Sequence, residues 1–89
     1  MRYLHLGKGT LVREDEIVGI FDLDITSQSH LTRKFLAASE RAGRVINAAE
    51  DLPRSFVLCR RKGETRVYLS QIASATLLKR AEERGQIME

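Results

Sequence analysis

The stretch RSFVLCRRKGETRVYLS, residues 54–70, is the part of the sequence that decides the fold. Residues Phe56–Cys59 are apolar at successive positions, which is typical of a strand buried on both faces. The segment KGET then provides a turn, and RVYLS, residues 66–70, returns as an antiparallel partner. The stretch therefore predicts a β-hairpin whose first strand is buried on both faces.

The same hairpin lies in the most basic part of the chain. The formal net charge is +3, and residues 31–66 hold nine basic and four acidic residues. A turn of two or four residues across KGET would place Arg61 opposite Arg66, and a turn of three would place Arg60 there. Like charges facing each other across two strands repel. Either Glu64 and solvent offset this repulsion, or a nucleic-acid phosphate does, and the sequence leaves both interpretations open.

Two further β segments precede this hairpin. RYLHL, residues 2–6, alternates polar and apolar residues, and Gly7 and Gly9 flank Lys8 in what the pattern predicts to be a tight hairpin turn. Residues Ile17–Phe21 form a short β-branched run that predicts another buried strand.

Two helices complete the predicted fold. The first can be capped by Ser27 or Ser29 and ends at Gly43. Its apolar residues recur at helical spacing and form one stripe: Leu31, Phe35, Ala38 and Ala42. This stripe covers either the sheet of its own chain or a neighbouring subunit. The second helix is expected to begin near Ser74, to turn Leu77, Leu78 and Ala81 inward, and to end at Gly85.

These elements predict one small α+β domain over residues 1–89, with four to five mainly antiparallel strands, two helices and a loose tail at 85–89. No apolar stretch approaches the roughly 20 residues that cross a bilayer, and no signal peptide is expected at the start. A single cysteine, Cys59, fits a reducing compartment. We therefore expect a cytoplasmic protein that does not contact a membrane.

No residue pattern in this sequence supports enzyme catalysis. Asp22 and Asp24 follow an apolar run, as in phosphatases of the haloacid-dehalogenase type, but only about 60 residues follow, too few for several βαβ units. We interpret both as acids that lead into a helix start. The spacing of His5, His30 and Cys59 predicts no metal site, and Cys59 is expected to be a buried, inert thiol. We expect no enzyme activity, no cofactor and no small-molecule substrate.

The order of several segments resembles a known bacterial family. These segments are YLHLG (3–7), IVGIFD (17–22), PRSFVL (53–58) and LSQIASATLLKRA (69–81). They are similar to the extracellular-matrix regulators of the Rem family, and to its RemB-like branch more than to RemA. The resemblance implies a cytoplasmic transcription regulator of biofilm matrix genes with a fold similar to the LytTR DNA-binding domain. It also implies a homo-oligomer, such as a ring, that binds double-stranded DNA through a basic rim.

The resemblance also guides the choice of DNA-contacting residues. Where RemA-type members carry basic residues, this chain has Glu16, Leu52 and Pro53. The expected contacts therefore move to the basic residues of the central hairpin and its entry: Arg54, Arg60, Arg61, Lys62 and Arg66. The alternative is an oligomeric interaction or scaffold protein without strong DNA binding.

Overall fold

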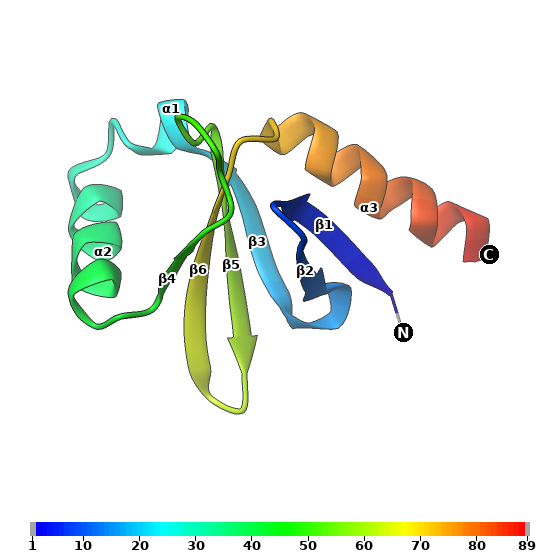
Figure 1. Ribbon diagram of the computed structural model, residues 1–89, viewed down its shortest axis with the longest axis horizontal. Coiled ribbons are helices and arrows are strands. Elements are labelled where there is room, and N and C mark those ends of the chain that lie inside the picture. Colours follow the sequence, from blue (N-terminus) through cyan, green and yellow to red (C-terminus); the bar gives the residue numbers. More distant parts are fainter. Residues whose placement is uncertain (1, 89) are drawn as a thin grey trace.

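The computed structural model describes the backbone of residues 2–88 and the side chains of residues 2–82. It shows an α+β domain in which a sheet lies between α2 on one side and a small hairpin with α3 on the other (Figure 1). The hairpin consists of β1 (Tyr3–Gly7) and β2 (Thr10–Arg13). The sheet has the order β3 (Ile17–Asp22), β5 (Ser55–Arg61), β6 (Glu64–Ser70) and β4 (Val45–Asn47), and the helices are α1 (Leu23–Thr26), α2 (His30–Arg41) and α3 (Ser74–Met88).

The α+β class is confirmed, and the element count is slightly higher than predicted. The described residues form six strands and three α-helices, where the sequence predicts four to five strands and two helices. The added helix, α1, is a single turn. Its start is fixed by Asp22, whose side chain accepts a hydrogen bond from the backbone N–H of Ile25 at 3.0 Å. The interpretation of Asp22 as an acid at a helix start is therefore confirmed.

The predicted hairpin is present as β5 and β6, the two central strands of the sheet, but its register differs from the predicted ones. Arg61 pairs with Glu64 and Cys59 pairs with Arg66, so no two arginines face each other across the strands. The turn occupies only Lys62 and Gly63, both with positive φ (50° and 81°), which is the backbone of a type I′ turn. Arg61 and Glu64 therefore still belong to the strands, and the expected arginine repulsion does not arise.

The β1–β2 hairpin closes one face of the sheet. Leu4, Leu6 and Val12 are buried and pack in one cluster with Val57 of the sheet and Leu77 of α3. The buried Ser70 hydroxyl donates a hydrogen bond to the Leu6 carbonyl at 2.7 Å, which ties the hairpin to β6. The end of the hairpin also approaches the backbone of Ala48, the residue after β4, and this is possible because Gly7 has no side chain. A Cβ there would lie 2.7 Å from the Ala48 carbonyl oxygen.

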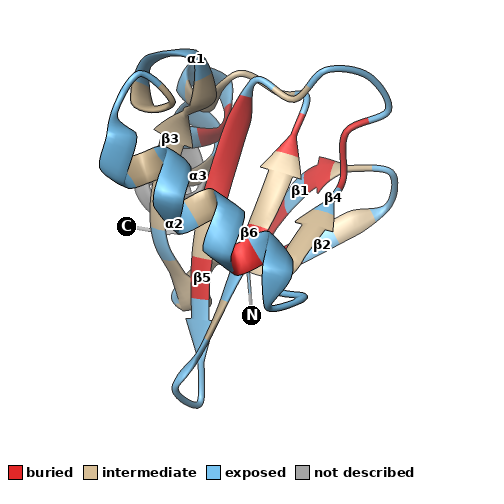
Figure 2. Ribbon diagram, turned by 90° about the vertical axis from the view of Figure 1, so that its left-hand side faces the viewer, coloured by how far each residue is buried: buried red, intermediate tan, exposed pale blue. Residues whose placement is uncertain are grey.

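The opposite face carries α2, which is anchored by few residues. Figure 2 shows this helix in front of the sheet, with most of its surface exposed. Its only buried residue is Ser39, whose hydroxyl donates to the Phe35 carbonyl at 2.8 Å. Leu31 is 77% exposed and Phe35 is 40% exposed. The apolar stripe thus does not cover the sheet of its own chain, because the helix is rotated by about a quarter turn toward Thr32, Leu36 and Ser39.

The last helix is longer than predicted. Leu77 is buried as expected, whereas Leu78 is 43% exposed. α3 continues past Gly85, because a glycine inside a helix costs only about 1 kcal/mol relative to alanine and does not by itself end it. The predicted loose tail at residues 85–89 lies outside the residues with described side chains and stays a prediction. No helix in the described part of the chain is long and apolar enough to cross a membrane.

Candidate nucleic-acid interface

Four of the five predicted DNA-contacting residues lie together at the far end of the β5–β6 hairpin. This end extends beyond the other elements of the domain (Figure 1). All four side chains are exposed, and we call them the tip cluster: Arg60, Arg61, Lys62 and Arg66. They lie close to one another because a two-residue turn joins the ends of the two strands that carry them.

The register decides which way each cation of the tip cluster points. Neighbouring residues of a strand alternate between faces, and paired residues share a face. Arg61 and Arg66 therefore share the face that turns toward β1 and β2, whereas Arg60 lies on the α2 side with its partner Thr65. Lys62 stands in the turn itself. The hairpin is thus a narrow ribbon with positive charge on both faces.

Arg54 does not belong to this group. It precedes β5 at the opposite end of the strand, where its backbone N–H donates to the Ser70 carbonyl and its own carbonyl accepts from Leu23 at the start of α1. Asp22, at the end of β3, is paired with Ser55, the residue that follows Arg54. The structure therefore places the predicted contacts at two separate ends of the domain.

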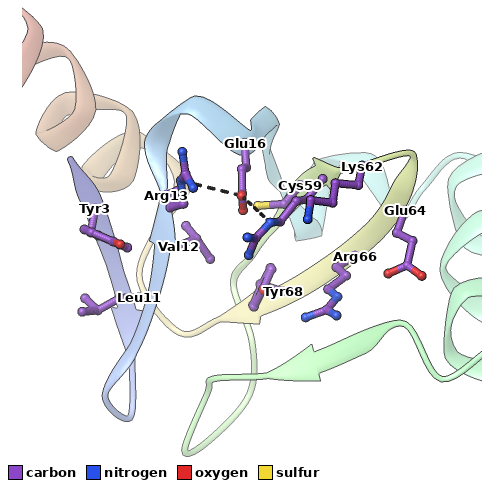
Figure 3. Close-up of a pocket in the computed structure, with 11 residues that line it drawn as sticks. Tyr3, Leu11, Val12, Arg13, Glu16, Cys59, Lys62, Glu64, Arg66 and Tyr68 are labelled. Atoms are coloured by element: carbon purple, nitrogen blue, oxygen red, sulfur yellow. Dashed lines mark ion pairs between the residues drawn. The ribbon is translucent and has the colours of Figure 1, made fainter. Parts of the chain in front are cut away.

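Glu16 reduces the positive charge on one face of the hairpin. Its carboxylate lies 3.4 Å from Arg61 and 3.7 Å from Arg13 (Figure 3). Arg13 also holds Asp15 through two hydrogen bonds of 2.8 and 3.1 Å. This hydrogen bonding by Arg13 holds the pKa of the Asp15 carboxyl below its usual value. Arg61 is therefore the cation of the tip cluster that a carboxylate already engages.

The other three cations of the tip cluster are available. Within the part of the chain with described side chains, Arg60, Lys62 and Arg66 make no ion pair. Glu64 is the one acidic residue of the segment from Arg60 to Arg66. A chain segment with this excess of unpaired cations suits contact with an anion, because no internal carboxylate has to be displaced.

Sequence reasoning missed Arg44, which the fold brings next to the tip cluster. Arg44 follows α2, and its carbonyl accepts a hydrogen bond from the N–H of Val67 at 2.9 Å. Arg44 and Arg66 line the same pocket beside the end of α2. The parallel pairing of β4 with β6 causes this proximity. The only signal in the sequence was a basic residue directly after Gly43. The sequence did not reveal that the strand after Arg44, β4, pairs with β6.

Cys59 lies beneath this surface as an unreactive thiol. The residue is buried, as predicted, and is a free cysteine. Burial raises the pKa of the Cys59 thiol to about 11, with a smaller contribution from the negative charge of Glu16. At neutral pH the thiol is protonated, so this residue is not suited to nucleophilic chemistry.

Comparison with known proteins agrees with the resemblance seen in the sequence. Residues 3–81 match the RemA-like family, whose description is extracellular matrix regulatory protein A-like. The chain is also similar to extracellular matrix regulatory protein B of Bacillus subtilis (strain 168). The two are 32% identical over 80 residues, which cover 90% of this chain and 90% of that protein.

Proposed function

From the premise that the chain belongs to the RemA-like family of extracellular matrix regulatory proteins, we propose that it is a DNA-binding transcriptional regulator of extracellular-matrix genes in biofilm formation. In this proposal the protein acts as a homo-oligomer, and each subunit presents its tip cluster to the phosphates of double-stranded DNA. Several subunits act together, because a few phosphate contacts per subunit give only weak, salt-sensitive binding.

The observation that carries the proposal is the shape and charge of the β5–β6 hairpin. It is a projecting two-stranded ribbon, and a ribbon of this kind is narrow enough to approach the major groove of DNA. Arg60, Lys62 and Arg66 have no carboxylate partner among the residues with described side chains. Arginine forks match phosphate oxygens, so contact with the DNA backbone is the chemistry that these side chains suit best.

The exposed stripe of α2 supports the oligomeric part of the proposal. Leu31 and Phe35 are exposed side by side on the helix, and Ile25 on α1 is 67% exposed. Neighbouring exposed apolar side chains such as Leu31 and Phe35 are typical of a surface that a partner covers. A second copy of the chain is the partner that the proposal requires, because the tip clusters must be repeated along the DNA.

A binding titration at two salt concentrations tests the proposal. Fluorescence anisotropy with a labelled duplex should show affinity that falls steeply with salt. For each phosphate contact, the logarithm of the binding constant should fall by about 0.9 when the salt concentration rises tenfold. The variant R60Q/R66Q should bind at least tenfold more weakly and with a slope lower by about two units per engaged subunit. The matched control K8Q/R80Q removes two exposed basic residues elsewhere and should bind like the native protein.

The competing function, an interaction or scaffold protein, predicts a different result. In that case no duplex binds at low salt, and both double variants behave alike. Native mass spectrometry on the same samples tests the oligomer. A monomer at the concentrations used for DNA binding would contradict the multivalent mechanism.

A further inference from the structure

A cavity lies between the β1–β2 hairpin and the face of the central hairpin that carries Arg61 and Arg66. Its volume is about 560 Å³, within the range of roughly 300–1,000 Å³ that is usual for small-molecule sites. Figure 3 shows Tyr3 and Leu11 on one side, and Tyr68 and Arg66 on the side of β6. The buried residues Val12 and Cys59 also line it. The cavity therefore combines apolar walls with a charged side.

The charges around this cavity favour an anion. Four of its lining residues are basic, namely Arg13, Arg61, Lys62 and Arg66, and two are acidic, Glu16 and Glu64. Glu16 is shared between Arg13 and Arg61, so this carboxylate is already engaged. Arg66 and Lys62 have no ion-pair partner among residues 2–82. The cavity therefore has two unpaired cations and only one further carboxylate, that of Glu64. An anionic group that enters the cavity would meet these two cations first.

The aromatic residues of the cavity favour a planar ring. The chain contains two tyrosines and no tryptophan, and both tyrosines, Tyr3 and Tyr68, line this one cavity. They come from β1 and β6, which are far apart in the sequence and which the fold brings to the same cavity. Tyrosine rings stack on planar heteroaromatic groups. The face of a tyrosine ring also attracts the guanidinium group of a neighbouring arginine.

We propose that this cavity binds a small aromatic anion of mononucleotide size. Its ring lies against the tyrosines, and its phosphate is held by Arg66 and Lys62. Because these two residues also belong to the tip cluster, the bound ligand occupies cations that the proposed function assigns to DNA. The ligand therefore weakens DNA binding, and this consequence, unlike the binding itself, rests on the proposed function.

Calorimetric titration of the full chain without DNA tests the site. The probes are adenosine 5′-monophosphate, which has a ring and a phosphate, adenosine, which has only the ring, and ribose 5-phosphate, which has only the phosphate. The mononucleotide should bind at least tenfold more tightly than either half, and tyrosine emission, corrected for nucleotide absorbance, should change as it binds. Equal binding of ribose 5-phosphate, or no binding by the mononucleotides of all four bases, would overturn the proposal.

Matched variants locate the site on one face of the hairpin. R66Q removes a cation of the cavity, and R60Q removes the same charge from the opposite face. Mononucleotide affinity should fall about tenfold or more in R66Q and remain unchanged in R60Q. The variant Tyr3→Leu, at a half-exposed strand position, should lose the preference for AMP over ribose 5-phosphate. Equal losses in R66Q and R60Q would mean general charge attraction and would refute the site.

A final measurement separates this inference from the proposed function. A saturating mononucleotide is added to the protein–duplex complex, and ribose 5-phosphate at the same ionic strength is the control. Release of the duplex by the mononucleotide alone supports shared use of Arg66. If the protein binds no duplex in any condition, the proposed function fails, while the calorimetric result still decides whether the cavity is a ligand site.

Discussion

The carboxylate of Glu16 lies 3.4 Å from the guanidinium group of Arg61, although 45 positions separate the two residues in the sequence. The contact forms because β3 pairs with β5 in an antiparallel register that brings Ile17 opposite Cys59. Glu16 also lies within 4 Å of Arg13, so one carboxylate serves two cations. In this arrangement Glu16 holds Arg61 on the face of the hairpin that turns toward β1 and β2, and it lowers the positive potential of the tip cluster.

Removing this carboxylate is expected to strengthen DNA binding. In E16Q the shape of the side chain is kept and Arg61 loses its charged partner, which frees it for a phosphate. Exposed ion pairs are worth up to about 1 kcal/mol, so affinity should rise by up to about fivefold and the salt slope should increase. Anisotropy titrations with the same duplex at two salt concentrations measure both quantities.

The control for E16Q is D15N, which also removes one negative charge from the single 3-10 turn η1 (Glu14–Glu16) between β2 and β3. Asp15 engages Arg13 and not Arg61. An equal gain of affinity in D15N and E16Q would show that only the net charge of the region matters and would contradict the specific role of Glu16.

The sequence allowed the two hairpins to be predicted but not the register of the central one. Strands and turns follow from local features, such as the apolar run of β5 and the glycines at positions 9 and 63. The register depends on which residues form the turn. The turn consists of Lys62 and Gly63, both with positive φ, so β5 extends to Arg61 and β6 begins at Glu64. The predicted registers place the turn further along KGET and therefore shift every cross-strand pair at the tip.

The orientation of α2 and the cavity were beyond sequence analysis for a different reason. The apolar stripe suggested one buried side of the helix, yet the side that meets the sheet presents Thr32, Leu36 and Ser39. Small polar residues can lie against a sheet when their hydroxyls bond within the helix, as Ser39 does. Likewise, nothing local predicts that Tyr3 and Tyr68 line one cavity, because that proximity depends on how β1 folds over β6.

The two lysines in the hairpin turns offer a matched pair of substitutions. Lys8 and Lys62 both have φ of 50°, a conformation that asparagine tolerates better than lysine. K8N and K62N should each raise the free energy of unfolding by up to about 1 kcal/mol, as measured by urea denaturation. DNA affinity should fall in K62N alone, because Lys8 lies at the tip of the other hairpin. A loss of affinity together with a gain of stability cannot be caused by misfolding.

The exposed stripe of α2 predicts where a charge would break the oligomer. Leu31→Glu places a carboxylate among Phe35 and the alanines of the stripe, and we expect the native mass to shift toward smaller species. The control is Ala37→Glu, which introduces the same charge on the same helix at an exposed position away from the stripe. Unchanged assembly in Leu31→Glu would show that subunits meet through another surface.

The buried thiol makes a contribution to stability that depends on pH. The pKa of Cys59 is about 11 in the folded protein and about 9.0 when the thiol is exposed to water. Because folding favours the protonated form, this contribution is complete below pH 9 and is lost as the pH rises toward 11. The difference in unfolding free energy between the native protein and C59A should shrink over this range. At pH 8 a thiol reagent should label the folded protein about 100-fold more slowly than the unfolded chain.

The contact between Gly7 and Ala48 predicts that adding a methyl group at Gly7 is the most destabilising such change in the first hairpin. Gly7 has φ of 120°, and an added Cβ would lie 2.7 Å from the Ala48 backbone oxygen. G7A should therefore destabilise the fold by about 3 kcal/mol, because backbone strain and overlap add. G9A is the control, since Gly9 has φ of 70° but a methyl group added there would meet no atom within 4 Å, so only a backbone cost of about 1 kcal/mol is expected. Urea denaturation of both variants measures the difference, and equal losses would show that β1 does not approach Ala48 this closely.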